Sequence, residues 1–425
     1  MAPIGAVSPL SNVSISVLNK QKKESLLRLR GIEWGTKVNR RKRTGGTGVF
    51  GVLFLVLAAC GMGGGGSSGG GGGGPNCNCT IISGGNTSFS GPLGIAVDRA
   101  GNIWIPNYNG NSVTELTKSS GYSAGGAVNI SGGSTNFSQP SFIAVDGAGN
   151  IWVPNHGNNS VTELTVASGY AAGSAINIIG GSTNFSGPDG IAVDGGGNIW
   201  ISNHRNDTVT ELTASSGYAA GSALNTTNTG TSAAFAGPDG LAVDQGGNVW
   251  VPNDSPTSSS VTELTVLSGR VTGTGNISGG STGFSAPDDI AVDQSGNIWV
   301  TNTSGNSVTE LVVTSGRVTG ATNISGGNTG LSGPSEIAVD GAGNVWVANN
   351  NNNTVTELVK SSGYTSGSAV NFPESPSPGG PQGIAIDASG NVWIANFNSN
   401  SVTELLGKAT GVTTLPALAG GPPGS

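Results

Sequence analysis

Acidic side chains that recur at one place in a repeated pattern are the residues of this chain best suited to chemistry. In three consecutive repeats the residue after a shared proline is an aspartate, and two further acids lie one position later. These five residues are Asp189, Asp239, Asp288, Asp289 and Glu336. Carboxylate oxygens suit Ca²⁺ or Mg²⁺, and they also suit a cationic or hydroxylated ligand. The alternative is that an aspartate after proline only favours a turn.

A second set of unlike residues follows an asparagine that recurs 15 positions after this proline in each repeat. It contains the chain's two histidines, His156 and His204, at equivalent positions of neighbouring repeats. Imidazole nitrogens could add ligands for a transition metal, although solvated loop histidines are the simpler interpretation. Other repeats carry Tyr108, Asp254 and Phe397 at this position.

The repeat itself is the strongest signal in the sequence. An aspartate that ends a segment of the type Gly-Ile-Ala-Val-Asp recurs every 47 to 50 residues. A tryptophan follows it six positions later in each repeat. The aspartates are Asp98, Asp146, Asp194, Asp244, Asp293, Asp340 and Asp387. A self-similar period of this length indicates a solenoid or a propeller.

Each repeat contains four strand-like pieces, which in the first full copy are Gly94–Val97, Ile103–Pro106, Ser112–Leu116 and Ala127–Ile130. β-branched and aromatic residues bounded by Gly and Asn turns predict these strands. No helical periodicity supports an α-solenoid, and a parallel β-helix usually has shorter turns. The sequence therefore predicts an all-β fold, a seven-bladed β-propeller with four-stranded antiparallel blades.

Closure of the ring can also be predicted from the sequence. Seven pieces resemble a fourth strand, and the first of them, at 80–82, precedes the first complete repeat. We expect it to complete the blade begun by 384–405, with the tail at 412–418 as a competitor for that place. Closing a ring in this way removes exposed strand edges.

The strand pattern predicts where the variable residues meet. Strands of a blade alternate in direction, so the loop entering the first strand and the loop joining the second strand to the third open on the same face. Both variable sets lie in these loops. Five acids should therefore gather near the axis of one face, with both histidines beside them. The repeated Asp, Trp, Asn and Glu residues should instead be structural, with the tryptophans packed between blades and the glutamates on an outer strand.

The pattern resembles the NHL-repeat propellers and, among them, the virginiamycin B lyase-like proteins. The residues that carry the resemblance are 92–98, Pro-Leu-Gly-Ile-Ala-Val-Asp, and 101–105, Gly-Asn-Ile-Trp-Ile, and segments of the same pattern recur in all seven repeats. Propellers of this kind include binding scaffolds, lyases and lactone hydrolases, so the fold alone does not define the activity.

The resemblance implies a test for lyase activity. In virginiamycin B lyases a catalytic His follows the proline of an entering loop, and nearby glutamates help to hold Mg²⁺. None of the seven corresponding positions is His here, and the second strand ends in Asn where those enzymes often place Glu. The leading interpretation is a binding module with an acidic ligand- or cation-binding face. The alternative is a metal-dependent propeller enzyme of the lyase or lactonase type.

The N-terminal part resembles a lipoprotein signal. A basic cluster at 40–43 precedes an apolar run at 49–59, too short to span a bilayer comfortably. The sequence Leu-Ala-Ala-Cys at 57–60 resembles a lipobox, which implies that Cys60 is acylated, although a plain signal peptide is the alternative. We expect a leader at 1–59, a Gly-rich tether at 60–79, the propeller at 80–406 and a tail at 407–425. The predicted location is a bacterial envelope, held to the membrane by the lipid.

The charge and the cysteine content limit the classes of partner that the protein is expected to bind. The formal net charge is −7, but ten of the 17 Lys and Arg residues precede residue 44. The remainder carries 7 basic and 22 acidic groups, a net charge of −15. Such a surface should repel phosphate backbones and anionic lipid, so nucleic acid is an unlikely partner, while an unknown small molecule or protein remains open. Cys77 and Cys79 form a C-x-C pair outside the repeats, more simply an incidental, oxidised pair than a metal or redox site.

Overall fold

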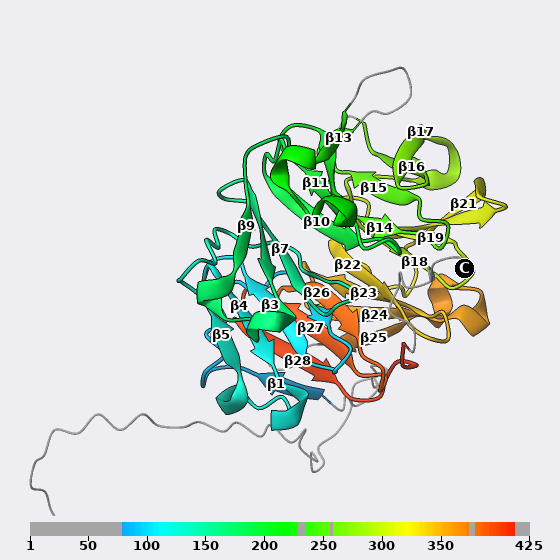
Figure 1. The fold of residues 1–425 in the computed structure, drawn as a ribbon. Helices are drawn as coiled ribbons and strands as arrows, with labels where there is room; N and C mark the ends of the chain where they lie inside the picture. Colours follow the sequence, from blue (N-terminus) through cyan, green and yellow to red (C-terminus); the bar gives the residue numbers. More distant parts are fainter. Residues whose placement is uncertain (1–78, 228–234, 256–257, 374–378, 413–425) are drawn as a thin grey trace, which may run out of the picture. The chain divides into compact units, whose positions relative to one another are not determined.

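The computed structural model describes residues 79–227, 235–255, 258–373 and 379–412 (Figure 1). The predicted leader, Cys60, the Gly-rich segment, Cys77 and residues 413–425 lie outside the described residues. Within them the chain forms seven four-stranded antiparallel sheets. The innermost strands of successive blades contact one another, and the last of them, β26 (Pro381–Ile386), contacts the first, β2 (Ala96–Val97). The protein is therefore a closed seven-bladed β-propeller, as predicted.

The blades are built from consecutive strands. Blade 1 is β2, β3 (Ile103–Asn107), β4 (Ser112–Leu116) and β5 (Val128–Ile130). Blade 2 is β6 (Ala144–Val145), β7 (Ile151–Asn155), β8 (Ser160–Leu164) and β9 (Ile176–Ile178). Blade 3 is β10 (Pro188–Val193), β11 (Ile199–Asn203), β12 (Thr208–Leu212) and β13 (Leu224–Thr227). Blade 4 is β14 (Ala242–Val243), β15 (Val249–Asn253), β16 (Ser260–Leu267) and β17 (Arg270–Ile277).

The remaining blades follow the same order. Blade 5 is β18 (Pro287–Val292), β19 (Ile298–Asn302), β20 (Ser307–Thr314) and β21 (Arg317–Ser325). Blade 6 is β22 (Pro334–Val339), β23 (Val345–Asn349), β24 (Thr354–Leu358) and β25 (Val370–Pro373). Blade 7 is β26, β27 (Val392–Asn396), β28 (Ser401–Leu405) and, as its outer strand, β1 (Cys79–Ile82).

Ring closure follows the prediction from the sequence. The outer strand of blade 7 comes from the N-terminal side of the propeller, because β1 pairs antiparallel with β28 and Cys79 lies opposite Leu405. Cys79 is disulfide-bonded. The C-terminal residues that the structure describes, which end at 412, do not take this place: Thr410 O accepts a hydrogen bond from Gly341 N, and Val412 N donates one to Asp387 O.

The repeated aspartate organises each blade through one hydrogen-bonded turn. In blade 1, Asp98 Oδ1 accepts a hydrogen bond from Asn102 N, and Oδ2 accepts bonds from Asn102 Nδ2 and from Trp104 Nε1. The seven repeated tryptophans are fully buried. Each lies between blades: Trp393 of blade 7, for example, packs with Ile95, Ile103 and Leu116 of blade 1. The cores therefore lie at the blade–blade interfaces, as predicted.

The repeated glutamates lie on the third strand of each blade, directly opposite the tryptophans. Glu211 of β12 pairs with Trp200 of β11, and its side chain is almost completely buried. Its Oε1 atom has no hydrogen-bond partner. These glutamates are therefore buried or half-buried acids.

Blades 4 and 5 differ from the others in how their third and fourth strands are joined. In blades 1, 2, 3 and 6 two short 3₁₀ turns make the connection: η1 (Lys118–Ser120), η2 (Ala124–Gly126), η3 (Val166–Ser168), η4 (Ala172–Ser174), η5 (Ala214–Ser216), η6 (Ala220–Ser222), η8 (Lys360–Ser362) and η9 (Ser366–Ser368). A tyrosine after the first turn packs on the tryptophan of the preceding blade, as Tyr122 does on Trp393 at 4.6 Å between ring centroids. In blades 4 and 5 long hairpins replace these turns. One further turn, η7 (Gly280–Thr282), lies between blades 4 and 5.

Helices contribute little to this fold. Among the residues that the structure describes, none forms a helix that is long and apolar enough to cross a membrane.

Candidate functional site

Backbone hydrogen bonds hold the two variable loops of each blade together on one face. Tyr108 N donates to Gly91 O at 2.9 Å in blade 1, and His204 N donates to Gly187 O at 3.0 Å in blade 3. The asparagine that ends each second strand stabilises the contact between these loops through side-chain hydrogen bonds. Asn203 Nδ2, for example, donates to Thr208 Oγ1 and Thr210 Oγ1. These loops define the pocket face.

A pocket of about 170 Å³ opens where the innermost strands meet on this face. Every blade contributes to its wall, which places it on the axis of the propeller. The wall is Leu93, Phe142, Asp189, Asp239, Asp288, Asp289, Ser335, Glu336 and Gln382. The five acids come from blades 3 to 6, whereas blades 1 and 2 contribute an apolar side. All five acids predicted from the sequence therefore line one pocket, and no Lys or Arg is part of its wall.

Two of the five acids bind the backbone of the next blade. Asp289 Oδ2 accepts a hydrogen bond from Ile337 N at 3.0 Å, and Glu336 Oε2 accepts one from Ile384 N at 2.9 Å. Both carboxyls therefore join blades as well as lining the pocket.

Replacing Asp289 by alanine should lower the free energy of unfolding by about 1–3 kcal/mol, because the buried N–H of Ile337 loses its acceptor. Urea unfolding measures this loss. Asp189→Ala is the comparison, since no hydrogen bond from backbone N–H to the Asp189 carboxyl exists among the described residues, and it should cost less than 1 kcal/mol. Equal costs for the two variants would contradict the bridging role of Asp289.

Of the other three acids, Asp239 and Asp288 form a hydrogen-bonded pair, and Asp189 lies apart from them. Asp288 accepts a hydrogen bond from Thr303 Oγ1 at 3.1 Å and also shares a side-chain hydrogen bond with Asp239. This arrangement suits one proton held between Asp239 and Asp288, with Asp239 as the donor. Asp189 lies at the edge of the pocket, next to blade 2.

Burial raises the pKa of four of these carboxyls. The pKa of Asp288 is raised to about 6 and that of Asp289 to about 7, in both cases chiefly by desolvation. Desolvation and the neighbouring acids also raise the pKa of Asp239 and Glu336 well above their ordinary values. The pocket therefore holds protons near neutral pH that a bound cation could displace.

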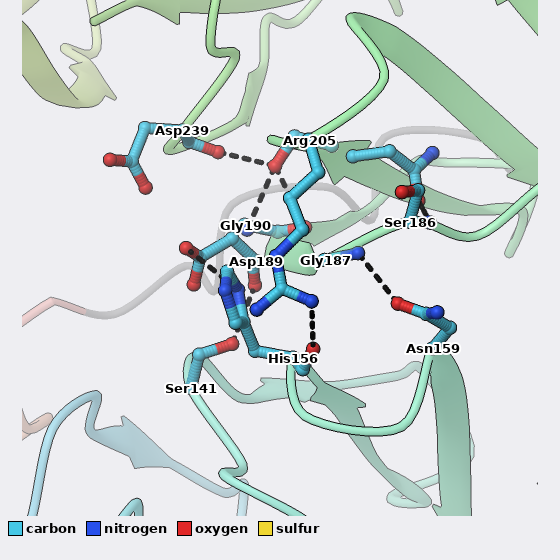
Figure 2. A network of polar contacts seen from close by, with 11 residues as sticks. Ser141, His156, Asn159, Ser186, Gly187, Asp189, Gly190, Arg205 and Asp239 are labelled. Carbon is cyan, nitrogen blue, oxygen red and sulfur yellow. Dashed lines mark hydrogen bonds and ion pairs between the residues drawn. The ribbon is translucent and has the colours of Figure 1, made fainter.

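The predicted residues of the second loop lie around the mouth of the pocket. His156 Nδ1 is 3.5 Å from Asp189 Oδ2, and it is buried without a hydrogen bond. Figure 2 shows the ring of His156 between Asp189 and Arg205, whose Nη1 donates a long hydrogen bond of 3.5 Å to His156 O. Tyr108 and Phe397 of neighbouring blades lie together with their ring centroids 6.3 Å apart. They form an aromatic side of the mouth.

His204 and Asp254 lie together outside the pocket wall, although Asp254 is close enough to Asp239 and Asp288 to add to the increase in their pKa that burial causes. His204 opposes the increase that burial causes in the pKa of Asp254, and neither residue lines the pocket. Within the described segments no group of three or more His, Cys, Asp or Glu side chains is arranged to hold a metal ion. The structure thus does not assemble His156 and His204 into a shared cluster of that kind.

The Mg²⁺ site that the lyase resemblance implies does not fit these residues. Where those enzymes often place Glu, this chain has Asn107 and its equivalents, which are buried and bonded to Ser and Thr hydroxyls of the third strand. Their amide groups stabilise the blade and are not available to a metal. These asparagines therefore do not form the metal site that a step of the lyase type would need.

Three residues of the site were not predicted. Phe142 lines the pocket one position after the variable residue, where other blades have Gly, Asp or Glu. Arg205 lies at the mouth, and it is the only Lys or Arg in any of the loops of this face. Thr303 bonds Asp288 from the neighbouring loop. Phe142 could have been found by aligning the two positions after the proline, and Arg205 by comparing charge between loops.

Comparison with known proteins defines the class of fold. No protein-family model matches the chain, and no curated protein matches its sequence. Virginiamycin B lyase from Staphylococcus aureus is similar in structure, with a TM-score of 0.61 and 16% identity, over 77% of this chain and 97% of that one. Hydrazine synthase from Kuenenia stuttgartiensis gives 0.60 and 18%, over 76% and 97%.

A third similar structure is the extracellular domain of a hybrid two component system from B. thetaiotaomicron. It gives a TM-score of 0.57 and 16% identity, over 78% of this chain and 41% of that one. At these identities the similarity establishes the fold alone. The chain has the virginiamycin B lyase-like fold of a seven-bladed β-propeller.

Proposed function

We propose that the protein is an envelope-anchored binding module whose axial pocket takes a small organic cation. The observation that carries this proposal is the wall of the pocket: five carboxyl groups from four consecutive blades face one opening, without a basic side chain among them. A cation that enters exchanges water for several carboxylates. Since the described residues lack a cluster suited to a metal ion, an ammonium or guanidinium group fits better than Ca²⁺ or Mg²⁺.

The size and the polarity of the pocket limit the class of ligand that fits it. A cavity of about 150 Å³ accommodates a molecule the size of benzene, so about 170 Å³ suits a ligand head of similar size. Leu93 and Phe142 give the pocket an apolar side opposite the acids, and Tyr108 and Phe397 extend it at the mouth. The ligand class that fits is an amine with a short apolar body.

Envelope anchoring through Cys60 is part of the same proposal. It rests on the basic, apolar and Leu-Ala-Ala-Cys segments of the N-terminal sequence. Display on an extracellular surface also agrees with the occurrence of this fold in the extracellular domain of a hybrid two component system. Mass spectrometry of the purified protein would test it: the expected product begins at Cys60 and carries a diacylglycerol group, and an unmodified Cys60 would contradict the anchor.

Calorimetric titration of the full chain with n-butylammonium should show binding, whereas the isosteric neutral ligand 1-butanol should bind at least about tenfold more weakly. Affinity should rise from about pH 5 to about pH 8, because the cation needs ionised carboxylates and the pKa values of Asp288 and Asp289 lie at about 6 and 7. The Asp288→Asn variant should lose about tenfold or more in affinity.

The matched control for this titration is Asp207→Asn, on the same face but outside the pocket wall. Asp207 Oδ1 accepts a hydrogen bond from Gly237 N, and an asparagine can still accept it. This variant should bind like the unaltered protein. Equal binding of the amine and the alcohol, or heat only with Ca²⁺, Mg²⁺ or Zn²⁺, would overturn the organic-cation proposal.

A further inference from the structure

Charged residues are unevenly divided between the two faces of the propeller. Fourteen acids of the propeller occupy the repeated Asp and Glu positions. Outside those positions, every acid that the structure describes lies in the loops or strand ends of the pocket face: Asp189, Asp207, Asp239, Asp254, Asp288, Asp289 and Glu336. The acids that vary between repeats are thus confined to one face.

The basic residues show the opposite distribution. Arg205 is on the pocket face, while the other six Lys and Arg residues after residue 44 follow the first or third strand of a blade, where the chain turns on the opposite face. We call these six the basic face: Arg99, Lys118, Arg270, Arg317, Lys360 and Lys408. Hydrogen bonds confirm that its loops lie together, since Asn102 Oδ1 of the first turn accepts from Lys118 N. All except Lys408 are exposed.

Exposed aliphatic side chains accompany these cations. Leu267 is 67% exposed, the highest value among the large hydrophobic residues described, and it lies directly opposite Arg270 across the turn of the blade 4 hairpin. At the turn of the blade 5 hairpin Arg317 lies opposite Thr314, so its partner across this turn is not aliphatic. Val166 and Leu406 are also exposed on this face. Basic side chains beside exposed aliphatic ones are typical of surfaces that lie on lipid headgroups.

The covalent connection to the N-terminal part is on this same face. β1 begins at Cys79, which lies opposite Leu405, at the end of β28 that leads to Leu406 and Lys408. A membrane anchor at Cys60 would be 19 residues upstream of this point. A membrane anchor at Cys60 would therefore be attached to the propeller on the side of the basic face.

We infer that the basic face docks on an anionic lipid surface and leaves the pocket face turned away from it. The inference rests on the proposed anchoring for its orientation, and it is independent of what the pocket binds. It differs from the expectation, made from a net charge of −15, that the propeller is repelled by anionic lipid, because the cations and the variable acids lie on opposite faces. The Debye length is about 8 Å at physiological salt, so the cations that project from this face act before the distant acids of the pocket face. The seven repeated aspartates also lie in the turns of this face. Six of them are buried and all seven accept hydrogen bonds within their own turns, whereas every cation of this face except Lys408 is exposed to solvent.

Arginine labelling tests the docking with one reagent and an internal control. The full chain would be treated with phenylglyoxal in buffer, with vesicles of phosphatidylethanolamine and phosphatidylglycerol, and with vesicles of phosphatidylcholine. In the anionic vesicles the labelling of Arg270 and Arg317 should fall about fivefold, while Arg205 on the pocket face should label as in buffer. Phosphatidylcholine should give little protection.

Two variants complete the test. Reversing charge in Arg270→Glu/Arg317→Glu should abolish the protection of Arg99, while Arg205→Glu, the matched reversal on the pocket face, should leave it unchanged. All these side chains are exposed, so the melting temperature should stay constant. Protection of Arg205, or free labelling of every arginine while the chain sediments with the vesicles, would overturn the docking. The second result would leave the anchor intact, and amine binding by the pocket would be unaffected by either.

Discussion

The propeller should unfold at a lower urea concentration at about pH 8 than at about pH 5. The cause lies in the repeated glutamates of the third strands. Burial, and then the aspartate of the same blade, raises the pKa of Glu163, Glu211, Glu357 and Glu404 from 4.5 to about 7. Each is packed at a blade–blade interface without a basic partner, so the protonated form is the one that fits.

The sign of the effect follows from these values. The folded protein holds the proton more tightly than the unfolded chain, so the stabilisation is fully present below about pH 4.5 and is lost as the pH rises through about 7. After allowance for solvent screening, each group should contribute on the order of 1 kcal/mol. Four such groups make the pH dependence one of the largest effects expected for this protein.

Two isosteric Glu→Gln variants at equivalent positions test whether these glutamates cause the pH dependence. Glu211→Gln removes one titrating group and should raise stability at about pH 8 but change it little at about pH 5. Glu310→Gln in blade 5 should do less, because Lys360 partly offsets the raised pKa of Glu310. A urea midpoint that stays level across this range, or that rises with pH, would contradict the burial of protonated glutamates.

The architecture could be predicted because each repeat contains the same local signals. The Asp-x-x-Gly-Asn turn and the apolar segments around it fix strands whose order the ring then repeats, and the extra strand at 80–82 implied closure. The hydrogen bond from Trp104 Nε1 to Asp98 Oδ2 at 3.0 Å could not be predicted in the same way. It depends on how the first and second strands twist around the turn, which a residue pattern does not specify.

The long hairpins of blades 4 and 5 were not predicted, although the sequence contains a signal for them. In blade 4 the two-residue turn Ser268-Gly269 adopts φ of 53° and 70°, the conformation that two-residue hairpins require. Blades 1, 2, 3 and 6 have Ser-Ser-Gly-Tyr or Ala-Ser-Gly-Tyr at their 3₁₀ turns, and blade 7 has no equivalent segment. The loss of tyrosine and the appearance of Arg270 after the glycine mark the change, and these substitutions build the projecting edge of the basic face.

The convergence of the acids was predictable, but their individual roles were not. Loop topology alone brings Asp189, Asp239 and Asp288 to one opening. Whether a carboxyl faces the pocket or the backbone depends on the spacing of neighbouring inner strands. That spacing lets Asp289 reach Ile337 N, whereas the longer loop of blade 4 leaves Asp254 near His204, outside the wall.

Repetition within the chain separates structural from functional acids. The aspartates of the turns accept several hydrogen bonds each and keep the same partners in all seven blades. The acids of the pocket have different partners in each blade. An acid that is identical in every blade therefore maintains the blade, whereas an acid that varies can line the pocket, as Asp189 does, or also join two blades, as Asp289 and Glu336 do.

Replacing Asp194 by alanine should cost about 3 kcal/mol or more of unfolding free energy. Its carboxylate accepts four hydrogen bonds at 2.9–3.0 Å, from Gly196 N, Asn198 N, Asn198 Nδ2 and Trp200 Nε1. The turn residues can bond to water after the change, but the indole N–H of the fully buried Trp200 cannot. The penalty comes mainly from this one unsatisfied donor and from the loss of the charge-assisted bonds.

The equivalent substitution in blade 4 provides the matched comparison. Asp244 makes the same four bonds, but it is more exposed than Asp194, so Asp244→Ala should cost less. Because each tryptophan packs against the next blade, the ring should still unfold in one transition, seen as a single shift in tryptophan fluorescence. Equal costs in both blades, or a separate early transition for one of them, would show that the turns act locally and that the Asp–Trp bond does not couple neighbouring blades.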